Sequence, residues 1–407
     1  MSRAYIYMEH PQTAEVITLG RLTLKGKTGE FLYAPDHVAQ GGWVPDPINY
    51  PLRAEAYTGI SKNRGIPGFI NDAMPDGWGE RLLHRAYGSE LGTLDFLLKS
   101  PNNDRIGNLM AGAATTPAAG LGEGAVPTLK GLAKFVAACE AVYDGQLDEA
   151  SVATLNVRQQ RSALGGARPK RTLQDNGMLI LAKPRDRFDH YDLPAIEYAC
   201  MTFAASKGLN AAKTALHAEN PSTLLVERFD RTPIAQGARR IPMLSALTLL
   251  DSEWNGPHHR DWRYAAVADE MRRRGVPDGD LQELFRRMCY NALVGNSDDH
   301  PRNHAIIWLD GGWRLSPMYD VLPMLDEGPA QTLAMAVGRE GSQISRANLL
   351  SHHAHFALAR DHAEHLLEEV ASWEEELKSY YAEVLGGEDL HMARDAASSV
   401  RMLRQGS

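Results

Sequence analysis

The most informative stretch of this chain of 407 residues is Asn296-Ser297-Asp298-Asp299-His300-Pro301-Arg302-Asn303. It follows an apolar run over 281–295 that predicts a helix, and it precedes a strand-like run over 304–308. A second polar segment, Met318-Tyr319-Asp320, comes after a predicted hairpin turn at 310–312. An acid, an amide five residues later and a second acid across a hairpin form the pattern of a phosphoryl-transfer site. The alternative is a plain turn that closes a helix, because Asn and Asp favour turns.

The composition is that of an ordinary globular protein. Hydrophobic residues make up 43% of the chain and charged residues 23%, and the length allows two or three domains around a large core. The formal net charge is -8, which does not favour non-specific binding to nucleic acid.

The cysteines and the hydropathy of the sequence bear on its compartment. Cys139, Cys200 and Cys289 are widely spaced, so neither a disulfide framework nor a zinc site is indicated, and free thiols suit a reducing cytosol. The sequence begins without the apolar segment of a secretory leader, and it contains no apolar run of membrane-spanning length. We therefore expect a cytoplasmic protein that does not enter a membrane.

The first third of the chain predicts a small antiparallel sheet followed by helices. Strands are expected at 5–7, 16–24 and 30–33, where polar and apolar residues alternate around a Gly-Lys-Thr-Gly turn. Helices are expected at 80–87, 93–99 and 129–143. The segment 115–127 is rich in Gly, Ala, Thr and Pro, and it is the best candidate for a domain boundary in this half.

A glycine-rich segment and a lysine on an apolar strand follow. Gly165 and Gly166 open a loop whose backbone N–H groups could approach phosphates, although the spacing up to Lys170 is not that of a Walker A loop. A hairpin at Asn176-Gly177 then leads into a strand that carries Lys183. A lysine there costs desolvation unless it meets an anion. The alternative is an edge-strand lysine whose amine reaches solvent.

Two more features have a functional and a structural interpretation. Glu197 lies on the predicted helix after the lysine strand, where a kinase keeps the glutamate that pairs with its lysine, but it could equally be solvated. The strand 223–231 corresponds to the hinge of a two-lobed kinase, or else to a core strand. His258 and His259 are adjacent and have no evident third ligand, which does not favour a metal site.

These segments occur in the order found in protein kinases, and together they resemble one bacterial family. The motifs Val226-Glu-Arg-Phe-Asp230, Gly295–Asn303 and Pro317-Met-Tyr-Asp320 are similar to those of the HipA family of serine/threonine kinases, the toxins of HipBA-type toxin–antitoxin pairs. The resemblance implies an α+β, two-lobed protein-kinase-like fold. It divides the chain into a β-rich subdomain similar to the HipA N-terminus (1–125), the remainder of the N-lobe with the Gly-rich loop and the ATP lysine (126–230), and a helical C-lobe (231–407).

The resemblance also implies a role for each motif residue. Asp298 corresponds to the catalytic base, and Asn303 and Asp320 correspond to the Mg²⁺ ligands. Asp299 is expected to be a turn residue that faces solvent. The residues implied to bind ATP are Gly165, Gly166, Ala167, Arg168, Pro169, Lys170, Lys183, Glu227, Arg228, Phe229, His300, Arg302, Asn303, Tyr319 and Asp320.

The function implied is that of a growth-arresting toxin that phosphorylates a component of translation, such as glutamyl-tRNA synthetase or another aminoacyl-tRNA synthetase. The implied partner is a small helix-turn-helix antitoxin of the HipB type, through which alone the chain would contact DNA. Two alternatives stay open: an antitoxin-binding co-repressor module with weak or no kinase activity, and a kinase for a small molecule.

The sequence departs from the family at one position. Family members are regulated by autophosphorylation of a serine in the Gly-rich loop, and this position falls on Ala163 here, with Ser162 one place earlier. We therefore do not expect the usual form of this self-regulation; the alternative is a shifted form that uses Ser162.

Overall fold

The computed structural model divides the chain into two compact units. The first unit comprises 1–187 and 227–244, and the second comprises 188–226 and 245–407. The residues that the structure describes are 2–75, 77–123, 126–143, 168–235, 237–254, 261–324 and 329–404. Both sides of the loop at 115–127 belong to the first unit. The boundaries expected at 125 and 230 stay predictions.

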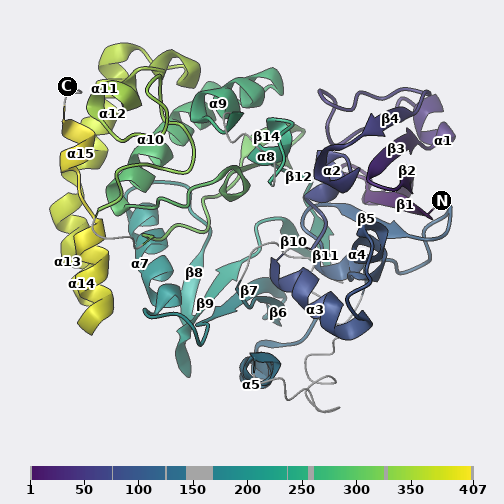
Figure 1. The fold of residues 1–407 in the computed structure, drawn as a ribbon, viewed down its shortest axis with the longest axis horizontal. Coiled ribbons are helices and arrows are strands. Elements are labelled where there is room, and N and C mark those ends of the chain that lie inside the picture. The colour runs from purple at the N-terminus through teal and green to yellow at the C-terminus, as the bar shows by residue number, and fades with distance from the viewer. Residues whose placement is uncertain are drawn as a thin grey trace. The chain divides into compact units, whose positions relative to one another are not determined.

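The first unit is built on a five-stranded antiparallel sheet (Figure 1). Its strands are β1 (Ser2–Glu9), β2 (Val16–Lys25), β3 (Thr28–Tyr33), β4 (Tyr57–Ile60) and β5 (Leu109–Gly112), in the order β4-β3-β2-β1-β5. Leu22 and Leu24 are buried and alternate with more exposed neighbours, as the period of a strand requires. The three predicted strands are confirmed, while β4 and β5 are short strands that sequence patterning did not detect.

The remaining elements of the first unit are short helices and hairpins. The α-helices are α1 (Pro35–Ala39), α2 (Gly68–Asn71), α3 (Gly77–Tyr87), α4 (Thr93–Lys99) and α5 (Leu132–Tyr143). The hairpins are β6 (Arg171–Asp175) with β7 (Met178–Pro184), and β10 (Arg231–Ile234) with β11 (Gly237–Arg240). The turn between β6 and β7 has positive φ at Asn176 and Gly177, which confirms the predicted two-residue hairpin.

The second unit is mainly helical and is built around one long helix, α10 (Asp278–Val294) (Figure 1). Leu281, Leu284 and Phe285 on this helix are fully buried, and α10 packs against α9 (Tyr264–Arg273) and α12 (Arg360–Ser372). An apolar surface on several sides is what places a helix at the centre of a domain rather than at its edge.

The other elements of this unit are shorter, and two of them, β9 and β12, also have residues in the first unit. They are α7 (Leu193–Ser206), β8 (Thr214–His217), β9 (Asn220–Glu227), β12 (Met243–Ser245), α8 (Ala246–Leu249), β13 (Ala305–Leu309), β14 (Gly312–Leu315), α11 (Arg346–Leu350), α13 (Glu374–Val384), α14 (Gly387–Ala396) and α15 (Val400–Leu403). β13 and β14 form the predicted antiparallel hairpin.

After residue 325 the sequence predicts a mostly helical chain, and this is confirmed for most of the described residues but not at 329–345 or around Ala357. Residues 329–345 contain no helix and instead form short bridges, such as Gly338 with Gly341. A Cβ atom at Gly338 would lie 2.0 Å from the carbonyl oxygen of Asn348, so only glycine fits there. The helix expected from 352 to 372 is interrupted at Ala357, which has a φ of 56°, and α12 begins only at Arg360.

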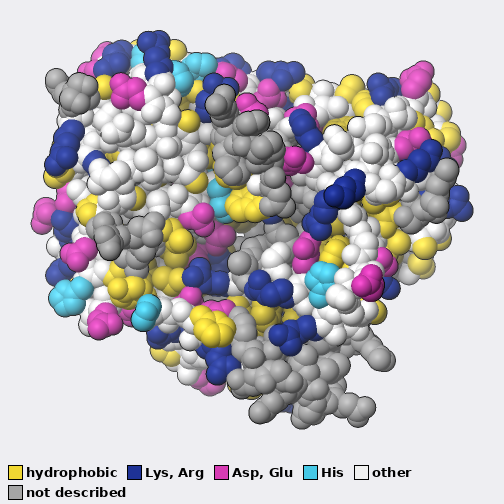
Figure 2. Space-filling model, in the orientation of Figure 1, with side chains coloured by type: hydrophobic (Ala, Val, Ile, Leu, Met, Phe, Trp, Pro, Cys, Tyr) yellow, Lys and Arg dark blue, Asp and Glu magenta, His cyan; other side chains and the backbone are white. Residues whose placement is uncertain are grey.

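The surface of the helical unit carries charges of both signs. On the face shown in Figure 2, its basic and acidic side chains are interspersed. Among the described residues, every helix is too short or too polar to cross a membrane.

Candidate active site

The loop that follows α10 is held at its start by a glycine and a buried asparagine. Gly295 adopts the left-handed conformation that ends a helix (φ 81°), and a Cβ atom there would lie 3.0 Å from the carbonyl oxygen of Ala396. The backbone N–H of Asn296 donates to the Asn291 carbonyl at 2.9 Å, and its side-chain amide donates to Oδ1 of Asn291 at 3.2 Å. The helix end therefore fixes where the loop leaves the core.

Within the loop, Asp298 and Asn303 are joined by the loop's own hydrogen bonds. Asp298 is exposed, and its carbonyl accepts from the backbone N–H of His300 at 2.8 Å and from Nδ2 of Asn303 at 3.3 Å. The backbone N–H of Asn303 in turn donates to the His300 carbonyl at 2.8 Å. The acid and the amide predicted to act together thus lie on one tightly turned segment.

Asp299 does not face solvent, and the prediction that it does is wrong. Its side chain is only 1% exposed, and Oδ1 accepts a hydrogen bond from Nε2 of His304 at 2.8 Å. The turn that exposes Asp298 directs the next side chain inward, where a carboxylate needs a polar partner. Adjacent acids in the sequence therefore have opposite surroundings.

The second acid, Asp320, follows a segment that the unit holds on both sides. The backbone N–H of Met318 donates to the Asn210 carbonyl at 2.8 Å, and the Met318 carbonyl accepts from the N–H of Ala212 at 2.9 Å. The hydroxyl of Tyr319 donates to the carbonyl of Arg302 at 2.8 Å and so ties this segment to the loop. Asp320 has a φ of 56°, a conformation that is uncommon outside glycine, more frequent for Asp, and sometimes retained at functional sites.

His300 lies among these acids and against Trp254. The two rings meet edge to face with centroids 4.6 Å apart, and the Arg302 guanidinium lies 5.0 Å from the centre of the same indole. Burial lowers the pKa of His300, although the carboxylates of Asp298, Asp320 and Asp299 act to raise it. Nδ1 of His300 is buried and has no hydrogen-bond partner among the described residues. A buried ring atom without a partner is suited to receive a group that is not part of the chain.

The contact with Trp254 is a part of this site that sequence reasoning missed. Trp254 lies in a polar loop after α8, has 37% of its surface exposed and also packs near Trp262. A tryptophan in an otherwise polar loop is the signal that could have indicated a role, because its ring offers a large apolar surface on which neighbouring side chains can pack.

The oxygen donors of the site fit a magnesium ion. Asn303 offers an amide oxygen and Asp320 a carboxylate, which are ligand types that Mg²⁺ accepts. Across the part of the chain that the structure describes, no cluster of three or more His, Cys, Asp or Glu side chains could hold a metal by itself. Two protein ligands are enough for Mg²⁺, because water and substrate phosphates usually complete its coordination shell.

The structure describes some of the residues of the first unit that are predicted to bind ATP. Lys183 lies on β7 and is half-buried, Lys170 is buried and Arg168 is exposed. Gly165, Gly166 and Ala167 lie outside the described residues, as do Ser162 and Ala163. After β9, the N–H of Arg228 donates to the Leu179 carbonyl at 2.9 Å, so the backbone of the expected hinge is hydrogen-bonded to β7.

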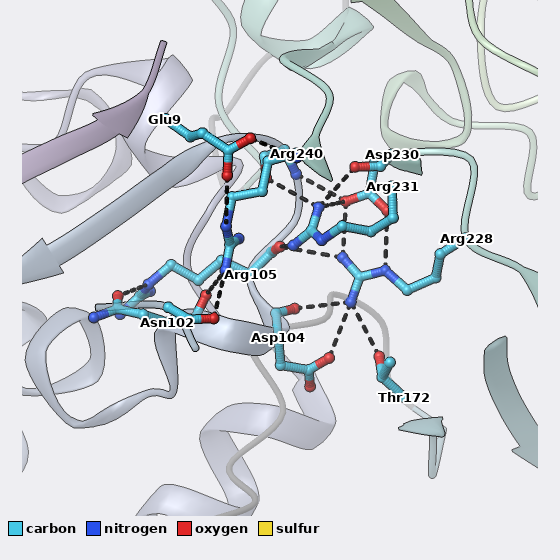
Figure 3. A network of polar contacts seen from close by, with 11 residues as sticks. Glu9, Asn102, Asp104, Arg105, Thr172, Arg228, Asp230, Arg231 and Arg240 are labelled. Carbon is cyan, nitrogen blue, oxygen red and sulfur yellow. Dashed lines mark hydrogen bonds and ion pairs between the residues drawn. The ribbon is translucent and has the colours of Figure 1, made fainter. Parts of the chain in front are cut away.

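The side chain of Arg228 belongs to a buried polar network rather than to an open surface (Figure 3). Its guanidinium donates to both carboxylate oxygens of Asp230 at 2.9 and 2.8 Å, to Oδ1 of Asp104 at 3.0 Å and to Oγ1 of Thr172 at 3.0 Å. It also donates to the Arg105 carbonyl at 3.1 Å. The guanidinium of Arg228 is therefore used within this network, and the nucleotide contact at Arg228 stays a prediction.

Glu197 and the two adjacent histidines are further features that the sequence singled out. Glu197 is buried on α7 with 6% of its surface exposed, so the interpretation as a solvated helix-face glutamate is wrong. His258 and His259 lie outside the described residues.

Comparison with known proteins identifies the family. Residues 162–377, more than half of the chain, match the family described as HipA-like C-terminal domain, and the chain belongs to this family. The structure is similar to that of HipA from Shewanella oneidensis in a complex of HipA, HipB and operator DNA, with a TM-score of 0.67, 19% sequence identity and 92% of each chain covered. The predicted fold class, a β-rich N-terminal part with a helical C-terminal part of the HipA type, is thereby confirmed.

Curated relatives match shorter segments. Y4mE, a protein of Sinorhizobium fredii that is named as a kinase, is 32% identical over 154 residues, which are 34% of each chain. The serine/threonine-protein kinase toxin HipA of Shewanella oneidensis is 25% identical over 206 residues, which are 44% of this chain and 47% of the relative. The chain thus spans between a third and a half of the length of the curated relatives it matches.

Proposed function

We propose that this chain is an ATP-dependent serine/threonine protein kinase. The observation that carries the proposal is the exposed Asp298, joined within one loop to Asn303 and linked through Tyr319 to the segment of Asp320. An exposed carboxylate that can orient a hydroxyl and oxygen ligands for Mg²⁺ are recurring parts of sites that transfer phosphate from ATP, because the chemistry depends on positioning and charge stabilisation.

In the proposed mechanism Asp298 orients the substrate hydroxyl and accepts its proton. Asn303 and Asp320 would hold Mg²⁺, which offsets the negative charge of the phosphates when it is bound. Lys183 and the loop from Gly165 to Lys170 are proposed to contact the phosphates, and the backbone of 227–229 to face the adenine. Belonging to the HipA-like family supports these roles, which rest on matching motifs.

The proposed biological role is that of a toxin that arrests growth. The acceptor would be a translation component, with glutamyl-tRNA synthetase as the first to test, and the regulatory partner would be a small helix-turn-helix protein. The similarity of fold to a HipA found with HipB and operator DNA supports such a partner, with DNA contacted through it. The substitution of Ala163 for the usual loop serine argues against self-inactivation at that position.

Transfer of label from ATP tests the proposal and separates it from the alternatives. Purified protein is incubated with γ-labelled ATP, Mg²⁺ and a bacterial lysate, and the protein and small-molecule fractions are counted separately. Label in serine or threonine residues of protein supports the proposal. Label in metabolites alone would make the chain a small-molecule kinase, and no transfer together with binding to a helix-turn-helix partner would make it a co-repressor module.

A pair of variants makes this test specific to the loop. Asp298→Asn removes the proposed base, whereas Asp310→Asn makes the same chemical change at an exposed turn of the β13–β14 hairpin. The proposal requires loss of label in the first variant and wild-type label in the second. Equal transfer by both variants would contradict the assignment of the base.

A further inference from the structure

We propose that Asp299 and His304 are positioning residues that set the geometry of Asp298 and Asn303. The inference rests on the proposed function of this loop and adds two residues to it. Asp299 directly follows the proposed base, and His304 directly follows the proposed metal ligand. Their contact therefore joins the two ends of the segment that has to present both groups.

The contact is short and buried on both sides. Nε2 of His304 lies 2.8 Å from Oδ1 of Asp299, and the two side chains are 3% and 1% exposed. Water can therefore offer neither group a comparable partner, and separating them would leave a buried carboxylate without a donor. Because a buried group that loses its partner lowers stability, the contact favours one arrangement of the loop.

The more exposed and the buried side chains of these two pairs are neighbours in the sequence. Asp298 is exposed and Asn303 is half-buried, while the neighbours Asp299 and His304 are both buried. The hydrogen bond from Nδ2 of Asn303 to the Asp298 carbonyl at 3.3 Å runs in parallel with the buried pair. Two links between the same ends restrict rotation of the segment more than either link would alone.

His304 is in turn anchored to the helical framework. Its carbonyl accepts from the N–H of Ala246 at 2.8 Å, and its ring meets the ring of Tyr264 edge to face at 5.3 Å. The hydroxyl of Tyr264 accepts from Nδ2 of Asn291 on α10 at 3.3 Å. The pair thus connects the loop to α8, α9 and α10, and a site supported by rigid elements keeps its geometry.

One oxygen of Asp299 is not satisfied by the pair. Oδ2 is buried and has no hydrogen-bond partner among the described residues, whereas most buried polar atoms have at least one. A buried oxygen that is left unsatisfied lowers stability, and a functional constraint is a common reason for such a cost.

Hydrogen–deuterium exchange on the full chain tests the pair without relying on kinase activity. The variants are Asp299→Ala, His304→Ala, the double Ala variant and His304→Gln, which keeps a side-chain N–H. The matched control is the pair Asp269 and His355 of the same unit, which has the same 2.8 Å contact but is 44% and 41% exposed. We expect faster exchange of the amides at 297–303 in the Ala variants, unchanged exchange in the interior of α10, and wild-type exchange in His304→Gln and in the control variants.

Kinetics on the same variants separates positioning from mere stability. At a temperature where each variant is folded, we expect kcat to fall by about 10–100-fold in either Ala variant while KM for ATP changes little. The double variant should lose no more than the worse single variant, because both remove one contact. Recovery of kcat in His304→Gln would support the role.

The inference and the proposed function can fail separately. If wild-type protein transfers no phosphate, the proposed function fails, and exchange at 297–303 still decides whether the pair holds the loop. If the wild type is active, unchanged exchange in this segment, unchanged kcat in Asp299→Ala, or multiplied losses in the double variant would each overturn the inference.

Discussion

Two buried acids, Asp230 in the first unit and Asp299 in the second, show how differently the same side chain is used. Asp230 accepts from the guanidiniums of Arg228 and Arg231 and from the N–H of Gly107 at 2.9 Å, so both of its oxygens are satisfied (Figure 3). Asp299 has one partner, and its second oxygen has none among the described residues. The first is an acid that holds a structure together, and the second lies beside an exposed acid in a loop.

The two acids differ in whether internal partners satisfy the whole carboxylate. A buried charge whose partners are all internal is stable only in that arrangement, and it has no free atom with which to bind a ligand. The loop of the second unit combines an exposed acid with buried polar atoms that are only partly satisfied, at Asp299 and at His300. Arg228 illustrates the reverse, because its motif indicated the nucleotide site while its guanidinium is used within the network.

The largest effect is expected at the exposed acid of the loop. Replacing Asp298 with Asn should lower kcat for phosphoryl transfer by about 10²–10⁴-fold, the usual contribution of a general base, while ATP still binds. Calorimetric titration with ATP and a transfer assay measure the two effects. Asp310→Asn, at an exposed position, serves as the control. Phosphoryl transfer that is retained in Asp298→Asn would contradict the role of this acid as the base.

A loss of stability rather than activity is expected in the network of the first unit. Arg228→Ala leaves Asp230 and Asp104 without their main donor and should lower the free energy of unfolding by roughly 3–5 kcal/mol. Arg273→Ala, which removes an exposed ion pair with Glu270, should cost about 1 kcal/mol or less. Chemical denaturation of both variants gives the comparison, and equal losses would show that burial does not decide the value of these charges.

The same network should respond to acid. Burial alone would raise the pKa of Asp230, but the guanidiniums of Arg228 and Arg231 outweigh it and hold the pKa below the usual range. A depressed pKa contributes stability that is complete above the unfolded value, near 3.9, and is lost as the pH falls toward the folded value. We expect the stability deficit of Asp230→Asn to be largest at neutral pH and to shrink below about pH 4 in urea titrations. A deficit that does not change with pH would contradict this origin of the stability.

The smallest effect is expected at the aromatic edge of the loop. Trp254→Ala removes the contacts with His300 and Arg302, and an exposed cation–π contact contributes about 0.5–1 kcal/mol, which corresponds to a few-fold change in kcat/KM. Trp254→Phe should retain most of the activity, since it keeps an aromatic ring. Leu309→Ala, at an exposed apolar position of β13, is the control for a general surface effect. Wild-type kinetics in Trp254→Ala would show that the indole does not support the loop.

Much of the fold could be predicted because its signals are local. The alternation in 16–24, the Asn-Gly turn at 176–177 and the apolar run of α10 depend on residues close together in the chain, and each was placed correctly. The elements that were missed, β4 and β5, are four residues long and need the rest of the sheet to form. The irregular path of 329–345 has no such signal, because it depends on the close approach of Gly338 to Asn348, which the residue types alone do not show.

The amino-acid sequence alone is enough to identify the spacing of acid, amide and second acid and the family of the chain, because both lie in short contiguous motifs. The fold was needed to show that Asp298 is exposed, whereas Asp299 is buried and hydrogen-bonded to His304. It was also needed to show that Arg228 belongs to a network with Asp104, which lies 124 residues away in the chain. The physical reason is that a carboxylate or guanidinium has the same chemistry everywhere in a sequence. Its function depends on whether water, a ligand or a distant part of the chain becomes its partner.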